Sequence, residues 1–338
     1  MRTLIVFLLV GFGAQLVDGS LGMAYGITAT TMALLAGATA AQASFAVNLA
    51  QVGTTLASGA SHWKFGNVDV KTVAKLGLPG MVGAFVGATL LSNISTEAAQ
   101  PLMTTILVAL GFYLLLRFGL GLGTPPVLNV REERQHSAGF LAPVGTFGGF
   151  LSATGGGGWG PLTVTTLMTA GKTTPRRVIG SVSASEFLVS LAASIGFLFG
   201  MGDQLREMGV IVLGLLAGGV IAAPFAAWLV SRVNAVVLGT FVGGLLVFLN
   251  LLRMSQSMEI DRTVITLLQI AIVVLTLVLG TRAWRRTRAA RDDAQAAPPA
   301  EEAAPGHEQG TDREHGADRE QGTGHEQRTD EDRARTHA

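Results

Sequence analysis

Long apolar stretches recur along most of the chain, separated by short segments that contain polar residues, glycine or proline. The stretches lie at about residues 3–17, 23–37, 41–62, 72–92, 98–118, 138–153, 160–171, 177–201, 208–231, 235–252 and 261–281. A helix that crosses a membrane needs roughly 20 apolar residues, and most of these stretches approach that length. The first two, and the sixth and seventh, are shorter and flank glycine-containing turns. We expect these two pairs to form broken or re-entrant helices, while the other stretches cross the bilayer.

The chain contains an internal repeat with an offset of about 134 residues. At this offset the matched pairs are Gly11 with Gly145, Gly22 with Gly156, Tyr25 with Trp159, Gly26 with Gly160, Thr31 with Thr165, Gly37 with Gly171 and Thr39 with Thr173. With a small shift, Arg117 near the end of the first half falls close to Arg253 near the end of the second. A period of this length is too long for a solenoid and is typical of transporters with duplicated halves.

The charges of the loops predict that the two halves are inserted in opposite orientations. Lysine and arginine collect in cytoplasmic loops. Basic residues occur in loops 63–75, 119–137 and 172–177, near Arg232 and after the last apolar stretch, whereas loops 38–41, 93–97, 202–207 and 253–262 are neutral or balanced. The loop after the second stretch is neutral and its counterpart after the seventh is basic. This alternation indicates an inverted repeat and places the C-terminus in the cytoplasm.

The composition argues against a soluble protein or an enzyme. Charged residues make up 14% of the chain, against about 25% in a soluble domain. The chain has no cysteine, which excludes disulfides, zinc–thiolate sites and cysteine catalysis. The six histidines are too widely spaced to form a metal cluster. We therefore expect no catalytic residues, no metal, no cofactor and no nucleic-acid partner.

The C-terminal segment has a composition of its own. Residues 285–338 hold 9 arginines and 13 acidic residues, with no aromatic residue. Such a segment cannot bury enough apolar surface to fold alone, so we expect a disordered cytoplasmic tail. A solvated spacer and a partner-binding segment are both compatible with this composition.

Two acidic residues stand apart from the others because they lie inside apolar stretches. These are Asp18, in the first turn, and Glu186, in the eighth stretch. An ionisable group at membrane depth is costly and is a functional hypothesis by default. Both are candidates for tuning the charge of a binding site or for carrying a coupling proton. The alternative is that each is a structural group, hydrogen-bonded to a backbone amide or a hydroxyl.

Polar residues form a stripe along two of the apolar stretches. One stripe consists of Ser44, Asn48, Gln51, Thr55, Ser58 and His62, and the other of Ser183, Glu186, Ser190 and Ser194. Spacings of three and four residues place each set on one face of a helix. Such a face either lines a path for a polar substrate or forms hydrogen bonds between helices.

Two glycine-rich turns are candidates for binding an anion. The second consists of Gly155, Gly156, Gly157, Gly158 and Trp159 and leads directly into Gly160-Pro161 and a helical run; the first contains Gly19, Gly22, Tyr25 and Gly26 at matching positions. A helix N-terminus presents free N–H groups and attracts negative charge. Two such turns from inverted halves are expected to meet near the middle of the bilayer. The alternative is that the glycines only allow short helices to pack closely. Neither turn is a nucleotide-binding loop, because no Gly-Lys-Ser or Gly-Lys-Thr follows.

The sequence resembles the sulfite exporter TauE/SafE family, also called the toluene-sulfonate uptake permeases. The resemblance covers about residues 5–255 and is carried by Gly11–Gly26, 43–51, 66–69, 78–80, Gly155–Pro161 and 179–187. It implies a permease with two related halves that moves sulfite, sulfonates or other small organic anions. The family often has His and Glu where this chain has Asn48 and Gln51. A proton-coupling role would then fall to Glu186, alone or with Asp18.

These observations predict an all-α polytopic membrane protein with two inverted repeats, short broken or re-entrant helix pairs and one extra C-terminal transmembrane helix. The expected divisions are a first repeat at 1–118, a cytoplasmic linker at 119–137, a second repeat at 138–253, an additional helix at 261–284 and the tail at 285–338. The expected function is secondary transport of small anions across the bacterial inner membrane. The alternative is an anion channel or uniporter without ion coupling.

The expected binding site combines the two turns with polar residues of the helical stripes. Its substrate-binding candidates are Gly19, Gly22, Tyr25, Gly26, Asn48, Gln51, Gly155, Gly156, Gly157, Gly158, Trp159 and Ser181, with Asp18 and Glu186 for coupling or charge tuning. The expected partners are the small anion and the lipid bilayer. Protons are the candidate coupling ion, and a homo-oligomer is a candidate assembly.

Overall fold

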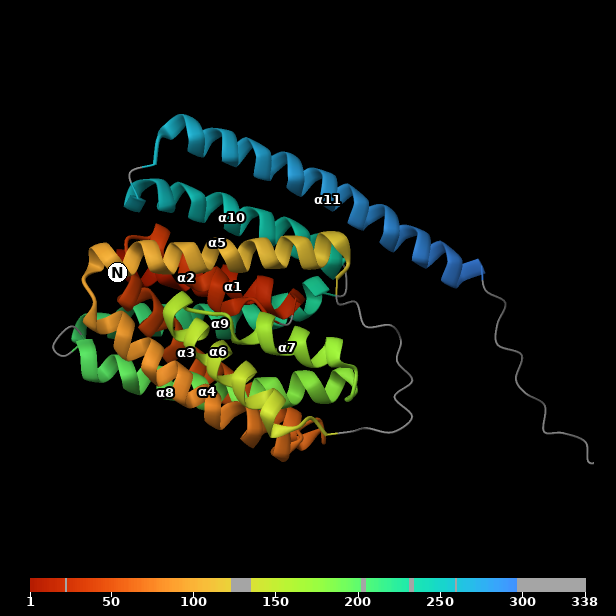
Figure 1. The fold of residues 1–338 in the computed structure, drawn as a ribbon, viewed down its shortest axis with the longest axis horizontal. Coiled ribbons are helices and arrows are strands. Elements are labelled where there is room, and N and C mark those ends of the chain that lie inside the picture. The colour runs from red at the N-terminus through yellow and green to blue at the C-terminus, as the bar shows by residue number, and fades with distance from the viewer. Residues whose placement is uncertain (22, 123–134, 202–204, 231–233, 259, 297–338) are drawn as a thin grey trace, which may run out of the picture. The chain divides into compact units, whose positions relative to one another are not determined.

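A computed structural model describes residues 1–21, 23–122, 135–201, 205–230, 234–258 and 260–296. Within these residues the secondary structure is helical, and each apolar stretch of the sequence corresponds to one helix. The helices are α1 (Arg2–Leu21), α2 (Tyr25–Leu35), α3 (Ala40–Lys64), α4 (Val70–Asn93), α5 (Thr96–Leu120), α6 (Ala138–Gly155), α7 (Trp159–Ala170), α8 (Pro175–Met201), α9 (Leu205–Val230), α10 (Ala235–Met258) and α11 (Arg262–Ala296). They are shown in Figure 1. The predicted all-helical class is confirmed for the described residues.

Five helices of the described residues are long and apolar enough to cross a membrane. They are Val70–Asn93, Thr96–Leu120, Pro175–Met201, Val236–Gln256 and Arg262–Ala290. Many large apolar side chains on these helices are exposed, including Leu78 and Val82 on α4 and Leu267 and Ile270 on α11. In water such exposure would be unfavourable, whereas a bilayer accommodates it. The helices α2 (11 residues) and α7 (12 residues) are short, as the sequence predicts, whereas α1 (20 residues) and α6 (18 residues), the first members of the two interrupted pairs, are longer than expected.

Polar residues at the helix starts fix where several helices begin. Thr39 and Gln42 form a reciprocal capping box at the start of α3. Asp69 accepts a hydrogen bond from the Lys71 amide at the start of α4, and Ser95 accepts one from the Ala98 amide at the start of α5. Such caps satisfy amides that have no partner inside the helix, each contributing about 1 kcal/mol.

Helices of the first half pack mainly against helices of the second half. The largest contacts join α1 with α9, α4 with α6, α5 with α10, α4 with α8 and α3 with α8. Two of these approaches require glycine. A Cβ atom on Gly11 would overlap the carbonyl oxygen of Leu215 in α9, and one on Gly145 in α6 would overlap the carbonyl oxygen of Leu76 in α4. The backbones can meet there because neither glycine has a side chain.

The last helix lies against α10, which in turn lies beside α5 (Figure 1). A small apolar cluster joins them: Leu115 of α5, Val247 and Leu251 of α10, and Ile272 and Leu279 of α11. Arg286 of α11 donates hydrogen bonds to the carbonyl oxygens of Phe118 and Leu120, at the C-terminal end of α5.

The helix α11 is longer than the sequence indicates. It continues to Ala296, through residues 285–296 that were expected to belong to the tail. These residues are mostly Ala, Arg, Asp and Gln without Gly or Pro, so they continue a helix already begun in the apolar stretch. The chain divides into two units, Met1–Ala294 and Gln295–Ala338. The rest of the expected tail, 297–338, lies outside the described residues.

Candidate functional site

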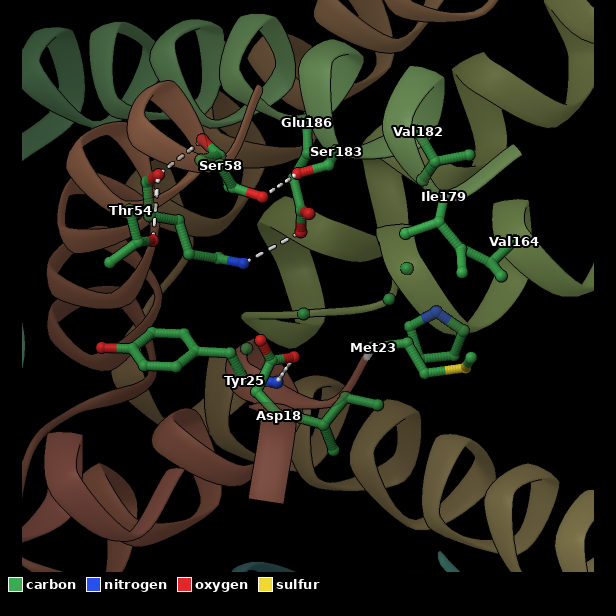
Figure 2. Close-up of a pocket in the computed structure, with 18 of the residues that line it drawn as sticks. Asp18, Met23, Tyr25, Thr54, Ser58, Val164, Ile179, Val182, Ser183 and Glu186 are labelled. Carbon is green, nitrogen blue, oxygen red and sulfur yellow. Dashed lines mark hydrogen bonds between the residues drawn. The ribbon is translucent and has the colours of Figure 1, made fainter. Parts of the chain in front are cut away.

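A cavity of about 250 Å³ lies where the two glycine turns meet the polar faces of α3 and α8. Figure 2 shows it, with Asp18 and Glu186 approaching from opposite sides. Its described lining residues are Gln15, Asp18, Met23, Tyr25, Gly26, Ile27, Gln51, Thr54, Thr55, Ser58, His62, Gly157, Gly158, Gly160, Pro161, Val164, Ile179, Val182, Ser183 and Glu186. The cavity therefore draws on both halves of the chain.

Asp18, which the structure places in the last turn of α1, caps the start of α2. Its Oδ1 accepts hydrogen bonds from the backbone N–H groups of Ala24, at 2.8 Å, and Tyr25, at 2.9 Å. The hydroxyl of Tyr25 donates to the carbonyl oxygen of Leu215, at 3.3 Å, which attaches the turn to α9. The carboxylate thus occupies amides that an anion would otherwise use. This geometry corresponds to the structural alternative for Asp18.

In the second turn, the start of α7 has no such cap. The N-cap residue is Gly158, which has no side chain to cap the helix, and among the described residues no side chain takes the place that Asp18 has at α2. The position that matches Asp18 in the repeat is Ser152, whose hydroxyl is buried without a hydrogen bond in the described structure. Gly157, Gly158 and Gly160 line the cavity, so the positive end of α7 faces it. Of the two turns, the second is the better one for attracting an anion.

The two turns are in direct contact. A Cβ atom on Gly26 would lie 2.6 Å from the Cα atom of Gly157. In the other direction, a Cβ atom on Gly157 would overlap the backbone of Gly26 and Ile27. The Thr30 hydroxyl donates to the carbonyl oxygen of Gly156 at 2.9 Å. The turns therefore meet, as the sequence predicts, and they do so at positions where only glycine fits.

The polar stripe of α3 divides into two parts. Gln51, Thr55, Ser58 and His62 line the cavity. Ser44 and Asn48 do not: the Ser44 hydroxyl donates to the carbonyl oxygen of Ala153 at 2.5 Å, and Asn48 donates to the Ser44 carbonyl oxygen at 2.8 Å. One part of the stripe thus lines the cavity, and the other part is buried in hydrogen bonds outside it.

The polar faces of α3 and α8 are joined across the cavity. The Nε2 atom of Gln51 donates to Oε1 of Glu186 at 3.0 Å, and the Ser183 hydroxyl donates to the Ser58 hydroxyl at 2.8 Å. On α8, Ser183 and Glu186 line the cavity, whereas Ser190 and Ser194 are buried away from it. Glu186 therefore lines the cavity and accepts a hydrogen bond from the side-chain amide of Gln51.

Several residues proposed from the sequence lie beside the cavity instead of lining it. Trp159 is fully buried; its indole N–H donates to the carbonyl oxygen of Val182 at 3.2 Å and its ring packs against Gly80. The Ser181 hydroxyl accepts from the Asp69 amide at 2.9 Å. Asn48, Gly155 and Gly156 are buried outside the lining. Gly19 belongs to the last turn of α1, and Gly22 lies outside the described residues.

Some lining residues were not proposed from the sequence. They include Gln15, Met23, Ile27, Thr54, Gly160, Pro161, Val164, Ile179 and Val182. A signal for two of them was present, because Ile179 and Val182 precede Glu186 by seven and four residues and so share its helix face. Gln15 likewise precedes Asp18 by three. The apolar members carried no chemical signal that distinguishes them from core residues.

The cavity is acidic for a chain expected to bind anions. Its described lining contains the carboxyl groups of Asp18 and Glu186 and the imidazole of His62, with no lysine or arginine. Within the residues that the structure describes, no group of His, Asp and Glu is arranged to hold a metal ion. Any attraction for an anion at the cavity wall therefore comes from neutral donors: backbone amides, hydroxyl groups and the side-chain amides of Gln15 and Gln51.

The fold and this polar cavity within apolar helices define a polytopic membrane transporter. Residues 7–253 match the family described as "Sulfite exporter TauE/SafE". The chain is 45% identical over 253 residues to the "Probable membrane transporter protein YtnM" of Bacillus subtilis (strain 168). The aligned region covers 74% of this chain and 82% of that protein. No solved structure matches the chain. The chain belongs to the sulfite exporter TauE/SafE family and is a transporter, not an enzyme.

Proposed function

We propose that this protein is a secondary transporter that moves a small anion, such as sulfite, a sulfonate or a related organic anion, across the bacterial inner membrane. The single observation that carries this proposal is the cavity in which the uncapped start of α7 and the side chain of Glu186 face the same space. The first group attracts an anion and the second can carry a proton. The family and the name of the relative support transport.

The size of the cavity favours a small substrate. Pockets for drug-sized ligands occupy about 300–1,000 Å³, whereas this one measures about 250 Å³. Part of that space is taken by the polar faces of α3 and α8. An oxyanion of a few heavy atoms, such as sulfite or methanesulfonate, fits this volume.

The acidic lining suggests that a proton accompanies the anion. An anion at the start of α7 would be repelled by a carboxylate at Glu186, and repulsion is strong where water is scarce. Protonation of Glu186 removes the repulsion. The Oε1 atom of Gln51 is buried without a hydrogen bond in the described structure. After rotation of the amide group, that oxygen can accept the hydrogen of a protonated Glu186.

Alternating access between inverted halves is part of the proposal. The helix contacts support it because they are reciprocal: α1 packs on α9 as α6 packs on α4, and α5 meets its counterpart α10. The alternation of basic and neutral loops supports opposite insertion and a cytoplasmic C-terminus. In this arrangement the two turns form the centre about which the halves move.

Uptake of sulfite into proteoliposomes under an imposed pH gradient tests the proposal. Glu186→Gln keeps a hydrogen-bonding side chain but removes the titrating group, so we expect it to abolish pH-driven uptake while leaving expression unchanged. The matched control is Glu97→Gln, because Glu97 is exposed in the first turn of α5. Uptake in Glu186→Gln that responds to pH as the wild type does would end the coupling hypothesis.

Counterflow distinguishes a transporter from a channel. Vesicles loaded with unlabelled sulfite should accumulate labelled sulfite transiently if the site alternates between the two sides. A channel or uncoupled pore would show no such acceleration by substrate on the far side, and that result would favour the alternative function.

A further inference from the structure

A buried arginine lies close to the cavity, and none of the residues that the structure describes gives it an acidic partner. Arg117, in the last turn of α5, has only 7% of its surface exposed. Among the described residues its guanidinium contacts the sulfur of Met23, at 2.5 Å, and the ring of Phe118, with 5.2 Å between the guanidinium carbon and the ring centroid. A thioether is a weak acceptor. A buried charge with such partners is costly unless a counter-ion reaches it.

The position of Arg117 near the end of a helix does not explain it. Cations often stabilise the carbonyl groups at helix C-termini. In this protein another arginine has that role, since Arg286 of α11 donates to the carbonyl oxygens of Phe118 and Leu120. The side chain of Arg117 is directed instead toward Met23, in the turn between α1 and α2.

Met23 contacts the guanidinium of Arg117 and also lines the cavity, which Arg117 does not. Figure 2 shows Met23 on the same side of the cavity as Asp18 and Tyr25. A Cβ atom on Gly160, in the first turn of α7, would lie 3.2 Å from the Cβ atom of Met23. One turn before Arg117, the Tyr113 hydroxyl donates to the carbonyl oxygen of Pro161 at 3.1 Å, which attaches α5 to α7. Met23 thus lies against both Arg117 and the uncapped end of α7.

We propose that Arg117 is the cationic group that binds the transported anion, and that Met23 is a movable partition between this guanidinium and the cavity. This inference rests on the proposed function and names a basic residue for an anion site whose described lining contains no lysine or arginine. Methionine is unbranched and flexible, so its side chain can swing aside at low cost. The anion would then lie between the amides of α7 and the fork of Arg117. A guanidinium pairs with two oxygens of a sulfite or sulfonate group at once.

Transport kinetics of three variants test this role in full-length protein reconstituted into liposomes. We expect Arg117→Gln to raise the KM for sulfite roughly tenfold or more, as expected for loss of a charge-assisted hydrogen bond. Arg117→Lys should recover part of the affinity because it keeps the charge. Arg253→Gln is the matched control, since this partly buried arginine occupies the corresponding region of α10 and is not among the cavity-lining residues.

Met23→Ala tests the partition separately. It should lower the KM for sulfite, because the guanidinium is then permanently open to the cavity. The same substitution should have no effect in the Arg117→Gln background. A decrease of equal size in both backgrounds would show that the opening does not lead to Arg117 and would overturn the assignment.

Thermal unfolding in detergent, with and without sulfite, separates binding from folding and from transport. We expect sulfite to raise the Tm of the wild type and of Arg253→Gln, and to leave that of Arg117→Gln unchanged. An equal sulfite-induced rise in Arg117→Gln, with an unchanged KM, would overturn the role of Arg117 while leaving the transport function intact. A wild type that neither transports nor is stabilised by sulfite or methanesulfonate would overturn both.

Discussion

Gln51 of α3 and Glu186 of α8 form a hydrogen bond across the cavity, from Nε2 to Oε1, at 3.0 Å. The two residues are 135 positions apart in the chain, and each belongs to the polar stripe of its own helix. The bond connects the two halves at the place where a substrate would pass. It also gives the carboxyl group at the centre of the proposed coupling a neutral partner that can donate or accept.

The pair should act as a unit in transport. Gln51→Leu removes the amide, so we expect lower pH-driven sulfite uptake. Combining it with Glu186→Gln should add little further loss, because both changes disrupt one interaction. Residues in direct contact show coupling energies of about 0.5–3 kcal/mol in double-mutant cycles. Initial rates for the two single variants and the double variant measure this coupling, and fully additive effects would contradict it.

Asp18 is expected to act as a helix cap and not as the coupling group. Asp18→Asn keeps an oxygen that can accept from the amides of Ala24 and Tyr25, so its stability and pH-driven uptake should stay near wild type. Asp18→Ala removes the acceptor and should destabilise the protein by about 1 kcal/mol, the usual cost of losing a cap. The Tm in detergent and the uptake rate are measured together. A well-folded Asp18→Asn that has lost pH-driven uptake would restore a coupling role to the carboxylate.

The contact between the turns should not tolerate a methyl group. In Gly157→Ala the new Cβ atom would overlap the backbone of Gly26 and Ile27, so the turns must separate. We expect a lower Tm and loss of uptake. The control is Gly139→Ala in the first turn of α6, where nothing lies within 4 Å of the new atom and alanine favours the helix by roughly 1 kcal/mol. Equal behaviour of the two variants would mean that the turns do not touch as described.

His136 should make stability depend on pH below neutrality. This residue precedes α6 outside the membrane-spanning segments; its ring is buried, its Nε2 has no hydrogen bond in the described structure, and it stacks on Phe140 with ring centroids 5.5 Å apart. Burial, and then the positive charge of Lys172, lower the pKa of His136. The folded protein therefore binds this proton less readily than the unfolded chain, in which the pKa is about 6.5.

The sign of the effect follows from that difference. The contribution of neutral His136 to the stability of the folded protein is fully present above a pH of about 6.5. It decreases as the pH falls and the unfolded chain becomes protonated, and it stops changing below the lowered pKa of the folded state. The Tm of wild type should thus fall more between pH 7.5 and 5.5 than the Tm of His136→Gln. Comparing the two proteins removes the contributions of other titrating groups. Parallel decreases in the two Tm values would contradict the buried neutral state of His136.

The tail should be dispensable for transport. The residues that line the cavity end at Glu186 and the family match ends at residue 253, while α11 continues to Ala296. Removing residues 297–338 therefore leaves the cavity and α11 intact. We expect unchanged sulfite uptake per mole of reconstituted protein. A clear loss of uptake would favour a partner-binding or regulatory role for this segment.

The sequence alone determined the class of the protein and the positions of its helices. The length of an apolar stretch decides whether that segment can cross a bilayer, and this length is a local property of the sequence. The sequence also identified Asp18, Glu186 and the two glycine turns, because acidic groups inside apolar stretches and paired glycines are rare enough to notice. The same local patterns identified the stripe on α3 but did not indicate which of its residues face a cavity.

The tertiary structure decided which of these residues share a space. It divided the α3 stripe into a buried part around Asn48 and a cavity-lining part that begins at Gln51. It also placed Trp159 in the core, although Tyr25, its counterpart in the repeat, lines the cavity. It also brought Arg117 to Met23, a contact between residues 94 positions apart. Periodicity shows on which side of its own helix a residue lies. Only the packing of several helices determines what faces that side.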